Sequence, residues 1–133
     1  MSVKPVVAVL CVLLGLACSR DAAEDRAVIA AVDELRDSAA ADPSARRALI
    51  EKLEKLPAST PLARSARDEC VKAYRALVDG KEAMAKFKHA LEDPKASAKD
   101  LGDLAGTEDL IKRSEEAMPA CNKAAVDLSL SRR

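Results

Sequence analysis

Apolar residues recur along the chain at the spacing of an α-helix, most regularly between residues 61 and 92. Eight apolar or small residues in that segment are separated alternately by four and three positions: Ala66, Cys70, Ala73, Leu77, Gly80, Met84, Phe87 and Leu91. Residues at this spacing form a seam along one side of a helix, which packs against another helix. Gly80 lies on the seam without a side chain, so a neighbouring helix can approach closely there. The pattern predicts a long helix with one buried face.

Shorter stripes of the same kind lie on both sides of this segment. Residues 22 to 40 carry Val28, Val32, Leu35 and Ala39, residues 43 to 56 carry Ala45, Leu49, Leu53 and Leu56, and residues 108 to 130 carry Ile111, Ser114, Met118, Cys121, Ala125 and Leu128. No segment alternates apolar and polar residues with a period of two, which is the pattern of a half-buried strand. The chain is therefore predicted to be all-α, with these stripes facing the core.

Three short motifs predict helix starts, because each places a side chain that can cap free backbone N–H groups before a proline that suits the first helical position. They are Asp42-Pro43, Thr60-Pro61 and Asp93-Pro94. A fourth start is predicted at Thr107, since acidic residues follow it in the first turn. The predicted helices are 22 to 40, 43 to 56, 61 to 92, 94 to 105 and 108 to 130. We expect a small bundle of four to five helices around one long central helix. The pattern leaves open whether the last two helices are continuous with the bundle.

The first 20 residues have the organisation of a signal peptide. Lys4 precedes an uncharged, largely apolar run from Pro5 to Ser19, and Arg20 follows it. As a helix this run is about 22 Å long, which is less than the roughly 30 Å thickness of a bilayer's hydrocarbon core. A removable signal is therefore favoured over a permanent transmembrane helix.

The end of this run resembles the lipobox of bacterial prolipoproteins. The matching residues are Leu14, Gly15, Leu16, Ala17 and Cys18. The resemblance implies cleavage between Ala17 and Cys18, a thioether-linked diacylglycerol on Cys18, and acylation of the new amino terminus. More than one acyl chain is what stable membrane anchoring requires. The implied organisation is a signal peptide over 1–17, a lipidated tether over 18–21 and a single helical domain over 22–133.

The same resemblance bears on where the protein resides. In enteric bacteria, a serine after the lipidated cysteine, as at Ser19, favours the outer membrane. We therefore expect an outer-membrane lipoprotein of a bacterial cell envelope that faces the periplasm or the exterior. The alternative is an ordinary signal peptide cut after Ala17 or Ser19, which leaves a soluble secreted protein.

Two cysteines remain in the predicted mature domain besides Cys18. Cys70 and Cys121 each lie on the apolar stripe of their own helix. An exported chain meets an oxidising compartment, so we expect a Cys70–Cys121 disulfide. The alternative is a pair of buried reduced thiols, which behave as small apolar residues.

Charge and composition narrow the classes of partner. The 22 basic and 22 acidic residues balance, so no global field attracts nucleic acid, and no nucleic-acid partner is expected. The sharpest local excess is a candidate contact patch of Lys81, Lys86, Lys88 and His89, although a plain solvent-exposed face explains these residues as well. Arg132 and Arg133 suit the exposed, frayed end of a last helix.

Candidate chemistry is sparse. His89 is the single histidine, and no ligand spacing for zinc or haem occurs, so neither a metal nor a cofactor is expected. The scattered glycines do not form a phosphate-binding loop, and no nucleophile motif occurs. We therefore expect a protein that is not an enzyme.

The sequence thus favours a lipid-anchored envelope protein with a non-catalytic binding or scaffolding role. The membrane, through lipid at Cys18, and another envelope protein are the expected partners. The alternative is a soluble secreted helical binding module or inhibitor without lipid. A carrier of small apolar ligands is disfavoured, because the chain has one tyrosine, one phenylalanine and no tryptophan with which to line a roomy pocket.

Overall fold

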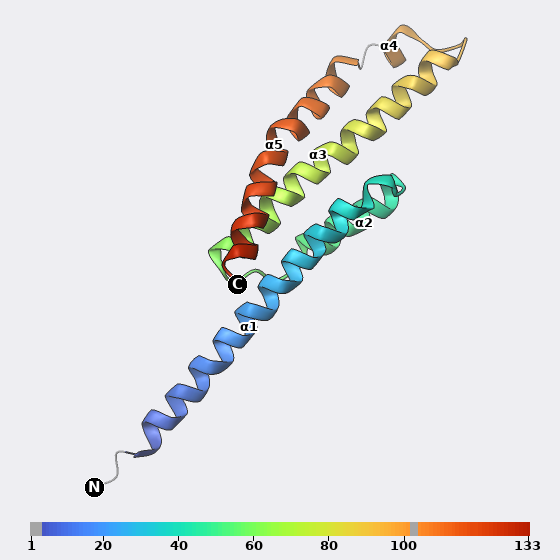
Figure 1. The fold of residues 1–133 in the computed structure, drawn as a ribbon. Coiled ribbons are helices and arrows are strands. Elements are labelled where there is room, and N and C mark those ends of the chain that lie inside the picture. The colour runs from blue at the N-terminus through green and yellow to red at the C-terminus, as the bar shows by residue number, and fades with distance from the viewer. Residues whose placement is uncertain (1–3, 102–103) are drawn as a thin grey trace.

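The computed structural model describes the backbone of residues 4–101 and 104–133, and the side chains of residues 19–99 and 106–133. The elements in these ranges are all helical: α1 (Lys4–Asp37), a 3-10 turn η1 (Ser38–Ala40), α2 (Pro43–Glu54), α3 (Pro61–Glu92), α4 (Ala98–Leu101) and α5 (Leu104–Leu130). The predicted all-α bundle with one long central helix is confirmed. α3 packs along α5, and α1 and α2 lie beside them (Figure 1).

Two of the predicted helix starts are confirmed in atomic detail. The Asp42 carboxylate accepts a hydrogen bond of 3.1 Å from the backbone N–H of Ser44, at the start of α2. The Thr60 hydroxyl accepts one of 3.1 Å from the backbone N–H of Ala63, at the start of α3. Each proline occupies the first helical position, where it sacrifices no hydrogen bond. These caps explain why α2 and α3 begin where the sequence predicts.

The predicted start at Asp93-Pro94 is wrong. Asp93 is instead the residue that ends α3, and its backbone N–H bonds to the carbonyl of Ala90. Its carboxylate accepts a 2.8 Å hydrogen bond from the backbone N–H of Lys95, which closes a turn. Asp favours such local side-chain turns as much as it favours helix caps. The predicted helix over 94–105 is therefore reduced to the single turn of α4.

Other helix boundaries also differ from the predicted ones. α1 is continuous from Lys4, well before residue 22, and ends at Asp37, so Ala39 lies in η1 and is exposed rather than buried. α5 begins at Leu104, three residues before the predicted start at Thr107. The described part of the chain thus answers the open question about the last helix: α5 belongs to the bundle through its contact with α3.

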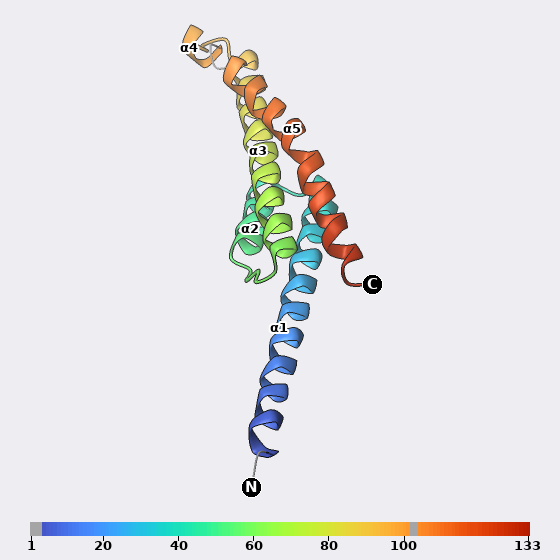
Figure 2. The ribbon, with the colours of Figure 1, turned by 90° about the vertical axis from the view of Figure 1, so that its left-hand side faces the viewer.

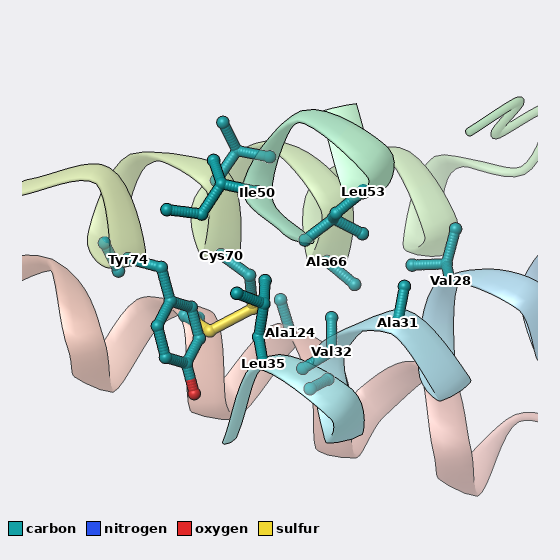
Figure 3. Packing of buried hydrophobic residues seen from close by; sticks show 14 of the residues in the cluster. Val28, Ala31, Val32, Leu35, Ile50, Leu53, Ala66, Cys70, Tyr74 and Ala124 are labelled. Atoms are coloured by element: carbon teal, nitrogen blue, oxygen red, sulfur yellow. A yellow bond between two sulfur atoms is a disulfide. The ribbon is translucent and has the colours of Figure 1, made fainter. Parts of the chain in front are cut away.

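The core is a narrow layer of small and branched side chains around the disulfide (Figure 3). Cys70 of α3 and Cys121 of α5 are bonded and fully buried, which confirms the predicted pair. Other fully or nearly fully buried side chains come from all four long helices: Val28, Val32, Leu35, Ile50, Leu53, Ala66, Ala73, Val78 and Leu128. The predicted stripes of α1 and α5 are therefore largely core faces.

The core face of α2 is rotated from its predicted position. Ala45 is exposed and Leu49 is half-buried, whereas the neighbouring Arg46 and Ile50 are buried, together with the predicted Leu53. The prediction placed apolar residues inward and did not allow for a buried arginine. Arg46 can lie in the core because its guanidinium stacks on the Tyr74 ring, 5.8 Å from the ring centroid.

The seam of α3 is buried over only part of its length. α1 and α2 cover the half of the α3–α5 pair nearer the C-terminus, and the other half of the pair extends beyond them (Figures 1 and 2). On α3, Gly80 is still buried, but Met84 and Leu91 are 39% and 60% exposed. The far half of α3 and α5 is thus a two-helix hairpin with an uncovered apolar edge.

α3 and α5 approach each other closely at Gly80. A Cβ atom built there would lie 3.1 Å from Ile111 Cγ1 and 3.3 Å from the Ile111 backbone nitrogen. The second distance leaves little room for adjustment, because that atom belongs to the backbone of α5. The absence of a side chain at Gly80 thus lets the two helices pack closely, as the seam predicts.

Replacing Gly80 by leucine should lower the free energy of unfolding by about 1–3 kcal/mol, since the larger side chain must push α5 away. Gly80→Ala should change it much less, because a gain in helix propensity of about 1 kcal/mol opposes the tight contact. Urea unfolding measures both effects. Ala85→Leu, at an exposed position of the same helix, is the control and should be near neutral. Equal stability of Gly80→Leu and Ala85→Leu would contradict the close packing.

Candidate functional site

The structure places the predicted site residues in different environments. Cys70 and Cys121 form a disulfide in the core. Cys18 belongs to α1, and its side chain lies outside the described residues. Its predicted lipidation therefore stays a prediction.

The basic residues of the candidate patch are all exposed on the far part of α3: Lys81, Lys86, Lys88 and His89. They do not share one face, because Lys81 and Lys86 are separated by about 140° around the helix axis at 3.6 residues per turn. Lys86 lines a surface groove, whereas Lys81 lines a small cavity beside α2. The two lysines therefore contribute to two separate features.

A groove runs along the outer face of α3, and we term it the α3 trough. It consists of two compartments of about 680 and 590 Å³, both of which touch Asp79 and Leu110. The first is lined by Glu54, Arg67, Asp68, Val71, Lys72, Arg75, Ala76, Asp79, Leu110 and Arg113. The second is lined by Arg47, Asp79, Glu82, Ala83, Lys86, Phe87, Ala90, Lys99, Thr107 and Leu110. α3 supplies most of the lining, and α2, α4 and α5 supply the rest.

Ion pairs between α2 and α3 hold one wall of the trough in place. Arg47 donates to Asp79 at 2.6 Å and to both carboxylate oxygens of Glu82 at 3.0 and 2.7 Å. These hydrogen bonds from Arg47 lower the pKa of Glu82, and the same contacts raise the pKa of Arg47. Further along, Arg75 donates to Glu54 at 2.9 Å. The acidic side chains of this wall are thus neutralised by arginines within the protein.

The trough carries an excess of positive charge. Seven basic and four acidic side chains line its two compartments together. Arg47, Arg67 and Arg75 account for the acids through their ion pairs. The lysines at positions 72, 86 and 99 add positive charge beyond those pairs and are exposed. The floor between them is apolar, with Val71, Ala83, Phe87 and Leu110 among its residues.

A buried polar junction fixes α1 to the start of α3 and to the end of the chain. Asp25 is 1% exposed and accepts a 2.8 Å hydrogen bond from the Thr60 hydroxyl, which in turn caps α3. Arg132 donates to the other oxygen of Asp25 from Nε, at 2.6 Å, and from Nη2. Arg132 is exposed, as expected, but it is not frayed, since Asp25 holds its side chain against the bundle.

Glu24, the neighbour of Asp25, makes the second contact of this junction. Its carboxylate accepts a 2.8 Å hydrogen bond from the backbone N–H of Ser59 and one of 3.1 Å from Arg20 Nε. Hydrogen bonding from Ser59 lowers the pKa of Glu24. The connection between α2 and α3 is thereby fastened to α1 where that helix leaves the bundle.

Sequence reasoning identified neither the α3 trough nor this junction. The partners in both are far apart in the sequence: Arg47 and Glu82 are separated by 35 positions, and Asp25 and Arg132 by 107. Spacing along one helix indicates only pairs three or four residues apart, such as Asp109 with Arg113, which the structure contains. No short-range signal indicates the long-range pairs.

In the part of the chain that the structure describes, no helix has an apolar stretch long enough to cross a bilayer. Nor do three or more His, Cys, Asp or Glu side chains gather there in a group that could hold a metal ion. Comparison with models of protein families, with curated proteins and with solved structures found no match. The geometry of the chain itself is therefore the basis for assigning a function.

Proposed function

We propose that this protein is a lipid-anchored component of a bacterial cell envelope that binds another envelope protein and has no catalytic role. The observation that carries the binding function is the α3 trough, which has an apolar floor and carries an excess of positive charge. The lipobox-like sequence that ends at Cys18 supports the anchor. The alternative is the same helical module secreted without lipid.

The arrangement of α1 suits a domain held close to a membrane. α1 is continuous from before Cys18 into the core, and Asp25 lies only about two helical turns after Cys18. α3, about 48 Å long by its 32 residues, extends from the end of the bundle where α1 enters to the opposite end (Figure 2). With acyl chains on Cys18, the trough would extend away from the membrane surface.

The trough fits an amphipathic α-helix of the partner with an apolar stripe and acidic flanks. The residues of α3 that line it extend from Arg67 to Ala90, which corresponds to about 35 Å of helix. Grooves of this kind accept the apolar face of a helix at i, i+3, i+4 and i+7 spacing. Lys72 and Lys86 favour acidic residues beside that stripe, because opposite charges across an interface promote association and orient the partner.

Site-specific photo-cross-linking in the native host tests this function. A photoreactive residue in place of Ala83, on the trough floor, should give a discrete adduct with a second envelope protein. The same residue in place of Ala30, exposed on α1 and outside the trough, should not. Peptide mapping of the adduct should identify an amphipathic helix with acidic flanks.

Charge reversal on α3 supplies the matched control. Lys86→Glu, in the trough, should reduce the Ala83 adduct severalfold, whereas Lys88→Glu, exposed on the same helix but outside the trough, should leave it unchanged. Equal adducts from positions 83 and 30, or equal effects of the two reversals, would show that the trough is only a solvated surface.

A further inference from the structure

Arg46 is a buried cation whose charge lacks an obvious partner. It lies in the first turn of α2 and is 3% exposed. Its Nε donates a weak 3.3 Å hydrogen bond to the Ser38 hydroxyl, and its guanidinium lies over the Tyr74 ring. Its Nη1 is buried and has no hydrogen-bond partner in the protein. A buried charge in this situation is costly unless another group compensates it.

Of the acidic side chains near Arg46 and Tyr74, Asp42 and Asp33 are engaged elsewhere, and Asp37 is exposed. Asp42 caps α2 through Ser44, and hydrogen bonding from Ser44 lowers the pKa of Asp42. Asp33 accepts a 2.9 Å hydrogen bond from Arg36 on its own helix. None of these carboxylates lines the space beside Arg46.

A small cavity adjoins Arg46. It has a volume of about 30 Å³ and is lined by Ala41, Pro43, Arg46, Val78 and Lys81. The side chains around it thus supply two cationic donors, one from α2 and one from α3, and otherwise only apolar surface. A volume of roughly 10–15 Å³ suffices for one water molecule, so the cavity has room for one or two species of that size.

We propose that this cavity binds one small inorganic anion of the halide class, with chloride as its ligand, between Arg46 Nη1 and the Lys81 ammonium group. A chloride ion accepts hydrogen bonds from both cations, and its negative charge compensates the buried positive charge of Arg46. A water molecule could also accept from both, but it would bring no charge and would find no side-chain acceptor for its own hydrogens among the lining residues. The bound ion would join α2 to α3 and stabilise the folded chain by mass action.

Thermal unfolding of the purified protein tests the proposal, with sodium chloride compared to sodium gluconate at equal ionic strength. Chloride should raise Tm by a few degrees and saturate, and bromide should do the same, whereas gluconate is too large to enter. A crystal grown in bromide should show an anomalous peak within hydrogen-bonding distance of Arg46 Nη1. Equal Tm values in chloride and gluconate would overturn the proposal and leave a water molecule as the occupant.

Variants separate a specific site from a general salt effect. Arg46→Met should abolish the difference between chloride and gluconate, while Arg47→Met, which breaks the ion pairs with α3, should lower Tm and retain the difference. Lys81 is exposed, so Lys81→Met should leave the protein folded. It should raise the half-saturating chloride concentration about fivefold, which is the loss of affinity expected when one exposed charge contact is removed. A chloride effect of full size in both Arg46→Met and Lys81→Met would also overturn the proposal.

Discussion

Replacing Cys70 and Cys121 together by alanine should lower the free energy of unfolding by about 4 kcal/mol. The disulfide joins residues 51 positions apart, and closing a loop of that length removes about this much conformational freedom from the unfolded chain in the chain-entropy model. The loss should be severe for this core, because five of the eight buried residues of α3 are alanine, glycine or cysteine, which bury little apolar area. A folded state that is stable by 5–15 kcal/mol would lose a large share of its stability.

Urea unfolding with and without a thiol reductant measures this effect. The reduced wild type should unfold at nearly the same urea concentration as the Cys70→Ala/Cys121→Ala variant, and the variant should not respond to reductant. Both sulfur atoms are fully buried, so the folded wild type should also resist reduction until it opens. A double variant within about 1 kcal/mol of the oxidised wild type would contradict a stabilising role for the disulfide.

Asp25→Ala should lower the free energy of unfolding by about 3 kcal/mol. The substitution removes the carboxylate that accepts hydrogen bonds from both Arg132 and the Thr60 hydroxyl. Breaking a buried charged pair costs about 3–5 kcal/mol. The lower end applies here, because Arg132 is 32% exposed and can regain water. Loss of the contact should also free the last residues of the chain, since Arg132 is bound to α1 through Asp25.

Asp33→Ala is the matched control on the same helix. Asp33 pairs with Arg36 at 2.9 Å, but both side chains are more than half exposed, so this substitution should cost less than about 1 kcal/mol. Chemical denaturation compares the two variants, and amide hydrogen exchange at the C-terminal residues should rise only in Asp25→Ala. Equal destabilisation by the two substitutions would contradict the buried junction.

The sequence-based predictions succeeded where local periodicity and capping agree. α3 begins and ends at the predicted residues because Thr60 caps it and its seam of apolar residues faces α5. The Asp93-Pro94 motif matches Asp42-Pro43, and its carboxylate likewise accepts from the backbone N–H two residues later, yet the chain after it forms a turn and not a helix. An aspartate before a proline does not by itself distinguish these two outcomes.

The candidate binding surface and the burial of Arg46 could not be predicted in the same way. The wall of the α3 trough depends on Arg47, whose partners lie on another helix more than 30 positions away. The sequence around Arg46 does not indicate that this charged side chain is buried. In the structure it lies on the core side of α2, against Tyr74. Such features arise from the packing of whole helices, which short-range spacing does not encode.

The intact mass of the protein, isolated from its native host with the N-terminal segment unaltered, tests the central claim most directly. We expect a chain that begins at Cys18 and carries the added mass of a diacylglyceryl group and a further acyl chain. Cys18→Ala should carry no acyl mass and should leave the membrane fraction. An unacylated wild-type chain, or one cut at another residue, would contradict the lipid anchor and favour the secreted alternative.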